Sequence, residues 1–89
     1  MQKRDIQITN RLGLHARAAA KLSHLANSFS SDIFLVFQEN RVNAKSLLGI
    51  MTLGASLGNT IRVECQGKDE QQAMDKIAAL FERKFDEEK

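Results

Sequence analysis

The sequence lacks proline, tryptophan and tyrosine, and its only cysteine is Cys65. One cysteine excludes an intramolecular disulfide and a metal site with two thiolate ligands. No segment approaches the roughly 18 apolar residues that a membrane-spanning helix needs, and no apolar stretch follows the charged residues after Met1, as a secretory leader would require. We therefore expect a cytoplasmic protein that binds neither a metal nor a membrane.

An excess of charge of one sign is also missing, because 13 basic residues accompany 11 acidic ones and the formal net charge is +2. Proteins that bind nucleic acids through phosphate contacts carry a much larger basic excess, so we expect no nucleic-acid partner. The hydrophobic fraction of 43% and the charged fraction of 27% are typical of a folded globular chain. The 89 residues predict a single domain over 1–89, which we expect to be a monomer.

Three segments show patterns typical of β-strands. Residues 5–9 and 61–66 alternate apolar and polar side chains, which predicts two strands with one buried face each and makes Cys65 a buried structural thiol. Residues 33–37 are apolar throughout, which predicts a central strand. A polar turn and a short arm at 41–44 then predict a hairpin.

Helical spacing predicts three helices. Residues 16–26 carry an apolar stripe on one side and a basic stripe on the other, formed by Arg17, Lys21 and His24. Ser46 as N-cap and Gly54 as stop bracket a short helix over residues 47–53.

The last predicted helix begins at a capping box formed by Asp69 and Gln72. Its apolar stripe is expected to run on through Lys84 and Phe85. The acidic residues that follow, Asp86-Glu87-Glu88, are expected to be a frayed, solvated end without function.

The resulting order is β-α-β-β-α-β-α. Strands and helices mixed in this way, with a hairpin in the middle, predict the α+β class: a four-stranded, mostly antiparallel sheet with three helices on one face.

His15 is the candidate for chemistry, because it stands at the start of the first helix, two residues before Arg17. A neutral imidazole is a competent nucleophile near neutral pH. The unpaired N–H groups of Ala16 and Arg17 could bind the oxygens of a phosphoryl group on the ring, with the Arg17 guanidinium as a clamp. The alternative is a surface histidine beside a helix cap. A metal site is disfavoured because His24 lies more than two helical turns away.

Two long motifs resemble one protein family. Residues 8–17 (ITNRLGLHAR) resemble the active-site signature of HPr, the histidine-containing phosphocarrier of the bacterial phosphotransferase system, and residues 42–55 are similar to its regulatory-serine segment. The two motifs lie at the family's spacing, and the predicted element order is that of the HPr open-faced sandwich. The resemblance therefore covers essentially the whole chain.

The resemblance implies a phosphoryl carrier, not an enzyme. Phosphoenolpyruvate, with Mg²⁺, would phosphorylate enzyme I, which would pass the group to Nδ1 of His15, and His15 would give it to a IIA-type protein. No bound cofactor is implied.

One departure points to a branch of the family. Ala18 stands where the family commonly has proline, and the segment HARAAAK and the acidic end are closer to the nitrogen-related branch, often called NPr. We expect a carrier of that branch, with a sugar-system HPr as the other possibility.

A carrier must dock on successive partners, so we expect an exposed apolar patch near His15. The candidates are Leu47, Leu48 and Met51 with Leu14 nearby, rimmed by Arg17, Lys21 and His24. The alternative is that these apolar side chains belong to the core. In the family, the position of Ser46 is phosphorylated by a dedicated serine kinase in some bacteria, which would place negative charge beside the patch.

Two other functions stay open at this point. One is an HPr-like domain that has lost phosphotransfer and acts by docking regulators. The other is a small RNA-binding module, which would need stacking aromatics on an open sheet face. Phe34 with Val36 is the only apolar candidate for that face.

Overall fold

The computed structural model describes residues 1–87 and contains one four-stranded sheet. Its strands are β1 (Gln2–Gln7), β2 (Asp32–Phe37), β3 (Asn40–Asn43) and β4 (Thr60–Gln66). The spatial order is β1-β4-β2-β3, and every neighbouring pair is antiparallel. β2 is an interior strand, as its unbroken apolar sequence predicts, and Leu35 lies opposite Val42 on one side and Val63 on the other.

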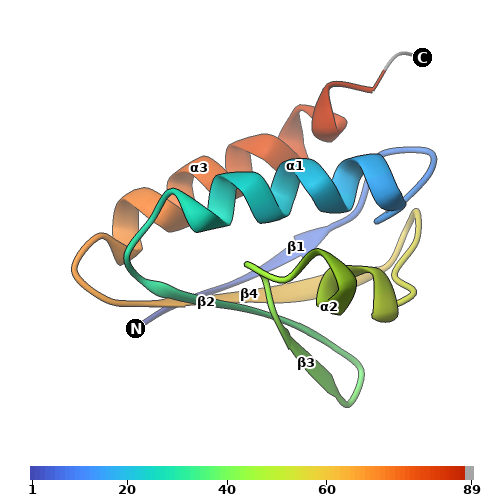
Figure 1. Cartoon of the computed structure of the whole chain (residues 1–89). Helices are drawn as coiled ribbons and strands as arrows, with labels where there is room; N and C mark the ends of the chain where they lie inside the picture. Colours follow the sequence, from blue (N-terminus) through green and yellow to red (C-terminus); the bar gives the residue numbers. More distant parts are fainter. Residues whose placement is uncertain (88–89) are drawn as a thin grey trace.

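The helices α1 (Ala16–Asn27), α2 (Leu47–Thr52) and α3 (Glu70–Glu82) complete the predicted β-α-β-β-α-β-α order. Figure 1 shows α1 and α3 running side by side over the sheet in opposite directions, so that α3 ends where α1 begins. This confirms the α+β open-faced sandwich and brings the end of α3 to the start of α1. None of the helices described is long and apolar enough to cross a membrane.

The core lies between the sheet and the helices, and its alanines explain how closely the layers approach. Ala18, Ala19 and Ala26 are fully buried on α1, where larger side chains would hold the helix away from its neighbours. Cys65 is buried as predicted, and burial, with the negative charges of Glu70 and Asp69 nearby, raises its pKa to about 11. The thiol is therefore protonated near neutral pH.

Ser46 caps α2 as the sequence predicts. Its Oγ accepts a hydrogen bond from the N–H of Gly49 at 3.0 Å, and Gly54 follows the helix with a φ of +67°. Ile50 is the buried side chain of this helix, and Leu53 at its C-cap is buried as well.

The predicted capping box at the start of α3 is wrong. The Asp69 carboxylate instead accepts hydrogen bonds from the backbone N–H groups of Ser30 and Ser31, each at 3.0 Å, and from the Ser31 hydroxyl. The first helical residue, Glu70, accepts a hydrogen bond from the N–H of Gly67 at 3.1 Å, which fixes the turn before the helix and does not cap it. The local motif could not show these partners of Asp69, because they lie 38 and 39 residues away in the sequence.

The predicted course of the last helix is also wrong. α3 ends at Glu82, and Lys84–Asp86 form a short 3-10 turn, η1, with left-handed φ values of 57°, 57° and 58°. Lys84 is exposed and does not continue the apolar stripe. Phe85 is buried all the same, with its ring edge against Phe81 at 4.8 Å between centroids.

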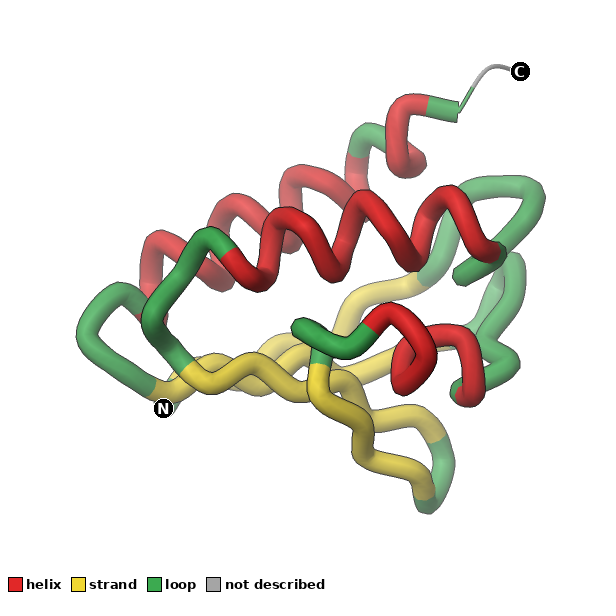
Figure 2. The backbone as a smooth tube through the Cα atoms, in the orientation of Figure 1, coloured by secondary structure: helices red, strands yellow, loops and turns green. Residues whose placement is uncertain are grey.

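The turn changes the direction of the chain after α3 (Figure 2), and its Phe85 carbonyl bonds to Lys21 of α1. Left-handed backbone costs an ordinary residue about 1–2 kcal/mol, so the surrounding contacts must hold it. The expectation of a frayed, solvated end is therefore wrong for Asp86 and Glu87, which bond to other parts of the fold. Glu88 lies outside the described residues.

Candidate functional site

His15 occupies the N-cap position of α1. Its backbone is extended, with φ −74° and ψ 177°, and its carbonyl accepts the N–H of Ala19 at 2.8 Å. The imidazole therefore projects from the first turn of a helix of 12 residues, where the first N–H groups have no intrahelical partner.

The preceding loop is fixed by close backbone contacts. The N–H of Leu14 donates to the carbonyl of Ala55 at 3.1 Å. Gly13 has φ +63°, and a Cβ at this position would lie 2.7 Å from the Cα of Ser56 and 2.9 Å from the carbonyl oxygen of Ala55. Only glycine fits both the conformation and the space, and this approach sets the position of His15 two residues later.

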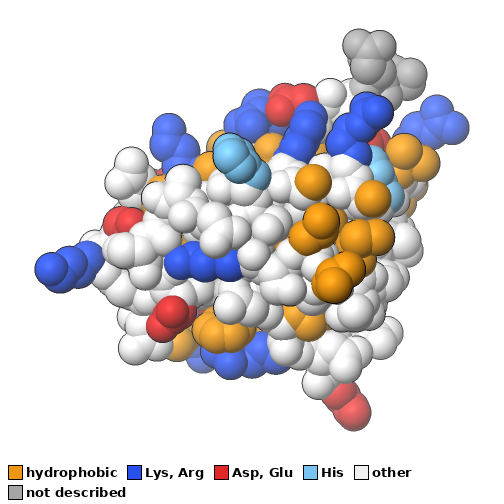
Figure 3. All heavy atoms as spheres, viewed as in Figure 1, with side chains coloured by type: hydrophobic (Ala, Val, Ile, Leu, Met, Phe, Trp, Pro, Cys, Tyr) orange, Lys and Arg blue, Asp and Glu red, His pale blue; other side chains and the backbone are white. Residues whose placement is uncertain are grey.

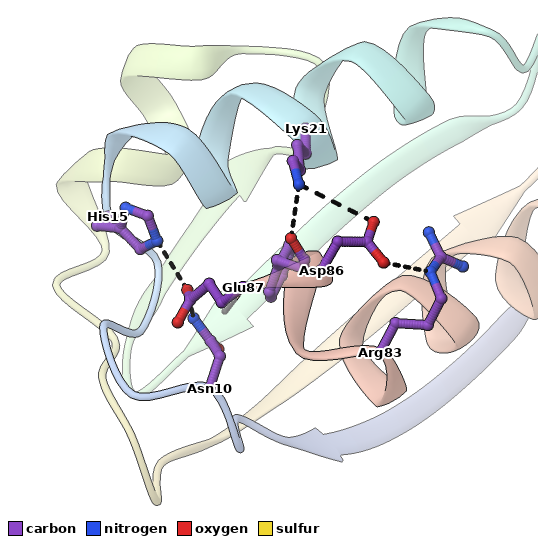
Figure 4. A network of polar contacts seen from close by, with 7 residues as sticks. Asn10, His15, Lys21, Arg83, Asp86 and Glu87 are labelled. Atoms are coloured by element: carbon purple, nitrogen blue, oxygen red, sulfur yellow. Dashed lines mark hydrogen bonds and ion pairs between the residues drawn. The ribbon is translucent and has the colours of Figure 1, made fainter. Parts of the chain in front are cut away.

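The ring of His15 contacts Glu87, which follows the turn after α3. Its Nε2 lies 2.8 Å from Oε2 of Glu87, and the same oxygen accepts a hydrogen bond from Nδ2 of Asn10 at 2.6 Å (Figure 4). Asn10 is almost fully buried and also donates to the carbonyl of Gly13 at 2.8 Å. The carboxylate thus joins the His15 ring to the loop that precedes it.

The charge state of Glu87 follows from these contacts. Desolvation raises the pKa of Glu87. The hydrogen bonds from Asn10 and His15 and the charge of His15 together lower it by more, so the pKa lies below its ordinary value. An ionised carboxylate only accepts hydrogen bonds, so Nε2 of His15 must be the donor. In the neutral ring the unprotonated nitrogen is then Nδ1.

The surroundings of His15 are suited to an anion. A hollow in the surface is lined by Arg11, Leu12, His15, Ala16, Arg17 and Glu87. Within residues 1–87 the N–H groups of Ala16 and Arg17 have no backbone acceptor outside the helix. Two guanidinium groups and two free amides at a helix N-terminus together favour a phosphoryl group.

Lys21, one helical turn after Arg17 on α1, binds residues of the turn that follows α3. Its Nζ donates to the carbonyl of Phe85 at 2.7 Å and lies 3.9 Å from Oδ2 of Asp86. The other carboxylate oxygen of Asp86, Oδ1, pairs with Nε of Arg83 at 3.1 Å. Lys21 was expected on the basic rim, and its first role in the structure is to tie the turn to α1. His24 is exposed as expected.

The expected apolar patch is present on α2. Leu47, Leu48 and Met51 are exposed by 40%, 75% and 43%, so the alternative that they belong to the core is wrong. Figure 3 shows hydrophobic side chains gathered on the face that carries α2, next to basic side chains. The prediction that Leu14 belongs to this patch is wrong, because Leu14 is only 6% exposed and packs in the core. In the same loop, Leu12 is 64% exposed.

Asn10 and Glu87 are the site residues that sequence reasoning missed. Asn10 lies inside the motif at residues 8–17 and could have been singled out as a buried amide. Glu87 gave no signal, because it contacts His15 across 72 residues and only through a left-handed turn that contains no glycine.

The open face of the sheet offers no free aromatic platform among the described residues. The guanidinium of Arg41 lies 3.7 Å from the centre of the Phe34 ring, and its Nε pairs with Glu64 at 3.1 Å. Among residues 1–87, no three His, Cys, Asp or Glu side chains are grouped as metal ligands.

Known proteins resemble this chain in sequence and in fold. Residues 2–83 match the family model described as the PTS HPr component phosphorylation site. The chain is 47% identical to the phosphocarrier protein HPr of Cupriavidus necator over 98% of both sequences, and 45% identical to the phosphocarrier protein NPr of Shewanella violacea over 96% of this chain and 93% of that one. The crystal structure of HPr-C-His from Thermoanaerobacter tengcongensis superposes with a TM-score of 0.96 at 44% identity over the whole of both chains.

The fold, the helix-capping histidine and these matches agree with one another. The match runs through both motifs that the sequence singled out, and the expected open-faced sandwich is confirmed. The chain belongs to the HPr family of phosphocarrier proteins of the phosphotransferase system.

Proposed function

We propose that His15 accepts a phosphoryl group on Nδ1 from phosphorylated enzyme I and passes it to a IIA-type protein. The observation that carries this proposal is the position of His15 at the N-terminus of α1, with Nε2 held by Glu87 and two free amides beside the ring. Phosphoenolpyruvate and Mg²⁺ act through enzyme I, so the chain needs no bound cofactor of its own.

The transfer is balanced without a further reactant. The lone pair of Nδ1 forms a bond to phosphorus while the bond between phosphorus and the donor nitrogen breaks, and that electron pair returns to the donor. The N–H groups of Ala16 and Arg17 and the guanidinium of Arg17 hold the phosphoryl oxygens, and the positive end of the helix stabilises their charge. The onward transfer reverses these roles.

Partner docking is assigned to the surface beside the hollow. Leu47, Leu48 and Met51 form an apolar patch of the kind that protein partners cover, with basic side chains at its edge. We propose that enzyme I and the IIA-type protein use this patch in turn.

Ser46 is proposed as a regulatory position. It is exposed and adjoins Leu47, and a phosphate from an HPr-type serine kinase would add about −1.5 to −2 charge there at neutral pH. This charge beside the patch would weaken docking of enzyme I.

The branch we propose is the nitrogen-related one. Its support is Ala18 directly after Arg17, together with the acidic chain end that lies against His15. The relatives include HPr at 47% and NPr at 45% identity, and identity alone favours HPr slightly, so the proposal of the nitrogen branch rests on these residues.

The experiment that tests the function is intact mass spectrometry after incubation with phosphoenolpyruvate, Mg²⁺ and enzyme I of each branch. We expect one acid-labile phosphoryl group on the wild type and none on His15→Ala, with faster transfer from the nitrogen-branch enzyme I. A folded protein that gains no phosphoryl group from either would overturn the carrier function and favour a docking regulator. RNA filter binding in the same experiment tests the remaining alternative.

A further inference from the structure

The turn after α3 is held in an unfavourable conformation by contacts that lead to His15. Lys84, Phe85 and Asp86 are left-handed in succession, and none of them is glycine. Such backbone persists only where the surroundings over-determine it, and it concentrates at functional sites. The matched family model ends at residue 83, so the turn and Glu87 lie beyond what it describes.

Three anchors hold the turn. The Phe85 side chain is 1% exposed against Phe81, and the Phe85 carbonyl accepts the Lys21 ammonium at 2.7 Å. Beyond the turn, the Glu87 carboxylate receives Asn10 at 2.6 Å and His15 at 2.8 Å. Figure 4 shows Glu87 extending from the turn toward the ring of His15 and the amide of Asn10.

The carboxylate is itself held in place. The Glu87 side chain is only 10% exposed, and the buried amide of Asn10 fixes the oxygen that His15 contacts. A carboxylate that is fixed by a buried group can orient an imidazole, which a mobile carboxylate in solvent cannot do.

We propose that Glu87 is a positioning residue for the phosphoryl transfer proposed above: it holds the His15 ring with its proton on Nε2 and leaves Nδ1 as the acceptor atom. This inference rests on the proposed function and extends it, because it adds a residue from the other end of the chain to the reaction. Glu87 touches neither the phosphoryl group nor a partner in this role.

The carboxylate also matches the charge that the reaction creates. When Nδ1 bonds to phosphorus and Nε2 keeps its proton, the ring becomes positively charged, and Glu87 faces that charge at hydrogen-bond distance. In the onward transfer the bond from Nδ1 to phosphorus breaks, its electron pair returns to Nδ1, and the ring leaves as a neutral group. The Nε2 proton moves in neither step.

The first test is the tautomer of His15 in the unphosphorylated protein. Long-range ¹H–¹⁵N correlation spectra at about pH 8.5, well above the ordinary histidine pKa of about 6.5, report which ring nitrogen is protonated. We expect the wild type and Glu87→Gln to show the Nε2–H pattern, because the glutamine oxygen still accepts, and Glu87→Ala to move toward the average of both tautomers. Ring signals of Glu87→Ala that coincide with those of the wild type would overturn the inference.

The second test is the initial rate of phosphoryl acceptance from enzyme I. We expect Glu87→Ala to be about tenfold slower than the wild type, in line with the loss of a partner that orients a histidine, and Glu87→Gln about threefold slower because it keeps the hydrogen bond without the charge. The matched control is Glu82→Gln, which removes the same charge from the exposed end of α3 and is expected to transfer at the wild-type rate.

The two tests separate the inference from the function on which it rests. Wild-type acceptance together with wild-type rates in both Glu87 variants contradicts the role of Glu87 and leaves the carrier function intact. If the wild type accepts no phosphoryl group, the carrier function fails, and the tautomer spectra alone decide whether Glu87 orients the ring. Should Glu87→Ala fail to fold by circular dichroism, Glu87→Gln decides through its rate: slower supports the inference and wild-type overturns it.

Discussion

The carboxylate of Asp69 and the backbone of Ser31 join two parts of the chain that lie 38 residues apart in sequence. Asp69 precedes α3 and Ser31 precedes β2, and the Ser31 N–H donates to Oδ1 of Asp69 at 3.0 Å. The hydroxyl of Ser31 bonds to the same oxygen. The start of β2 is therefore fixed to the start of α3.

The Asp69 contact predicts a dependence of stability on pH. The hydrogen bond from the Ser31 hydroxyl, with the Ser30 N–H next, lowers the pKa of Asp69 from 3.8 to about 2. A folded-state pKa below the unfolded one gives stability that is present above pH 4 and is lost as the pH falls from about 4 through about 2. We expect Asp69→Asn to melt below the wild type at pH 7 and the difference to shrink across that window.

Asp75→Asn is the control for this prediction, because Asp75 is exposed on α3 and bonds only to Gln71 within its own helix. Its melting temperature should follow that of the wild type at every pH. A gap between Asp69→Asn and the wild type that stays constant from pH 7 to pH 2 would contradict the assignment of the acid dependence to this carboxylate.

Gly13 and Gly54 make a matched pair for testing the loop before His15. Both have left-handed backbone, with φ values of +63° and +67°, but a Cβ on Gly13 meets Ser56 and Ala55 while a Cβ on Gly54 meets no atom within 4 Å. We expect Gly54→Ala to lower the free energy of unfolding by about 1 kcal/mol, from conformation alone. Gly13→Ala should cost about 2–4 kcal/mol, because the clash adds to it.

Urea unfolding measures both variants, and phosphoryl acceptance measures the consequence for His15. Gly13→Ala should also slow acceptance, since the loop that it displaces carries Asn10 and ends at the imidazole. Equal stability losses in the two variants would show that the close approach to Ser56 does not constrain the loop.

Local patterns predicted most of the fold because the residues that decide it are near one another in sequence. The apolar run of β2, the Ser46 cap and the alternation that buries Cys65 each depend on residues that are neighbours in the sequence. The errors share the opposite property. Asp69 bonds to serines almost 40 residues away, and Glu87 reaches His15 across 72 residues, so neither contact has a local signature.

Leu14 failed for a related reason. Neither helical nor strand periodicity assigns a face in a loop, and Leu14 turns inward because its N–H bonds to Ala55 and Gly13 allows the approach. The position of His15 was predictable from the helix pattern that follows it, whereas the partner of its Nε2 required the three-dimensional structure.

The docking patch predicts that affinity and stability separate on α2. Leu48 is 75% exposed and Ile50 is fully buried, two residues further on. We expect Leu48→Glu to weaken enzyme I binding about tenfold or more, measured by calorimetry, with a free energy of unfolding within about 0.5 kcal/mol of the wild type.

Ile50→Ala is the matched change on the buried side of the same helix. It should cost about 2–5 kcal/mol of stability in urea unfolding. Wild-type affinity of Leu48→Glu for enzyme I would exclude this end of α2 from the interface.

The last prediction separates the two roles of Ser46. Removing the cap in Ser46→Ala leaves the Gly49 N–H without its side-chain acceptor and should lower the free energy of unfolding by about 1 kcal/mol. Asp is an equally good N-cap residue, so Ser46→Asp should keep the wild-type stability while placing a negative charge beside Leu47. If charge near the patch regulates docking, Ser46→Asp binds enzyme I more weakly than the wild type, whereas Ser46→Ala binds enzyme I with the affinity of the wild type. Calorimetry with both variants at about 0.1 M salt decides between them, and weaker binding by Ser46→Ala alone would assign the effect to the cap and not to the charge.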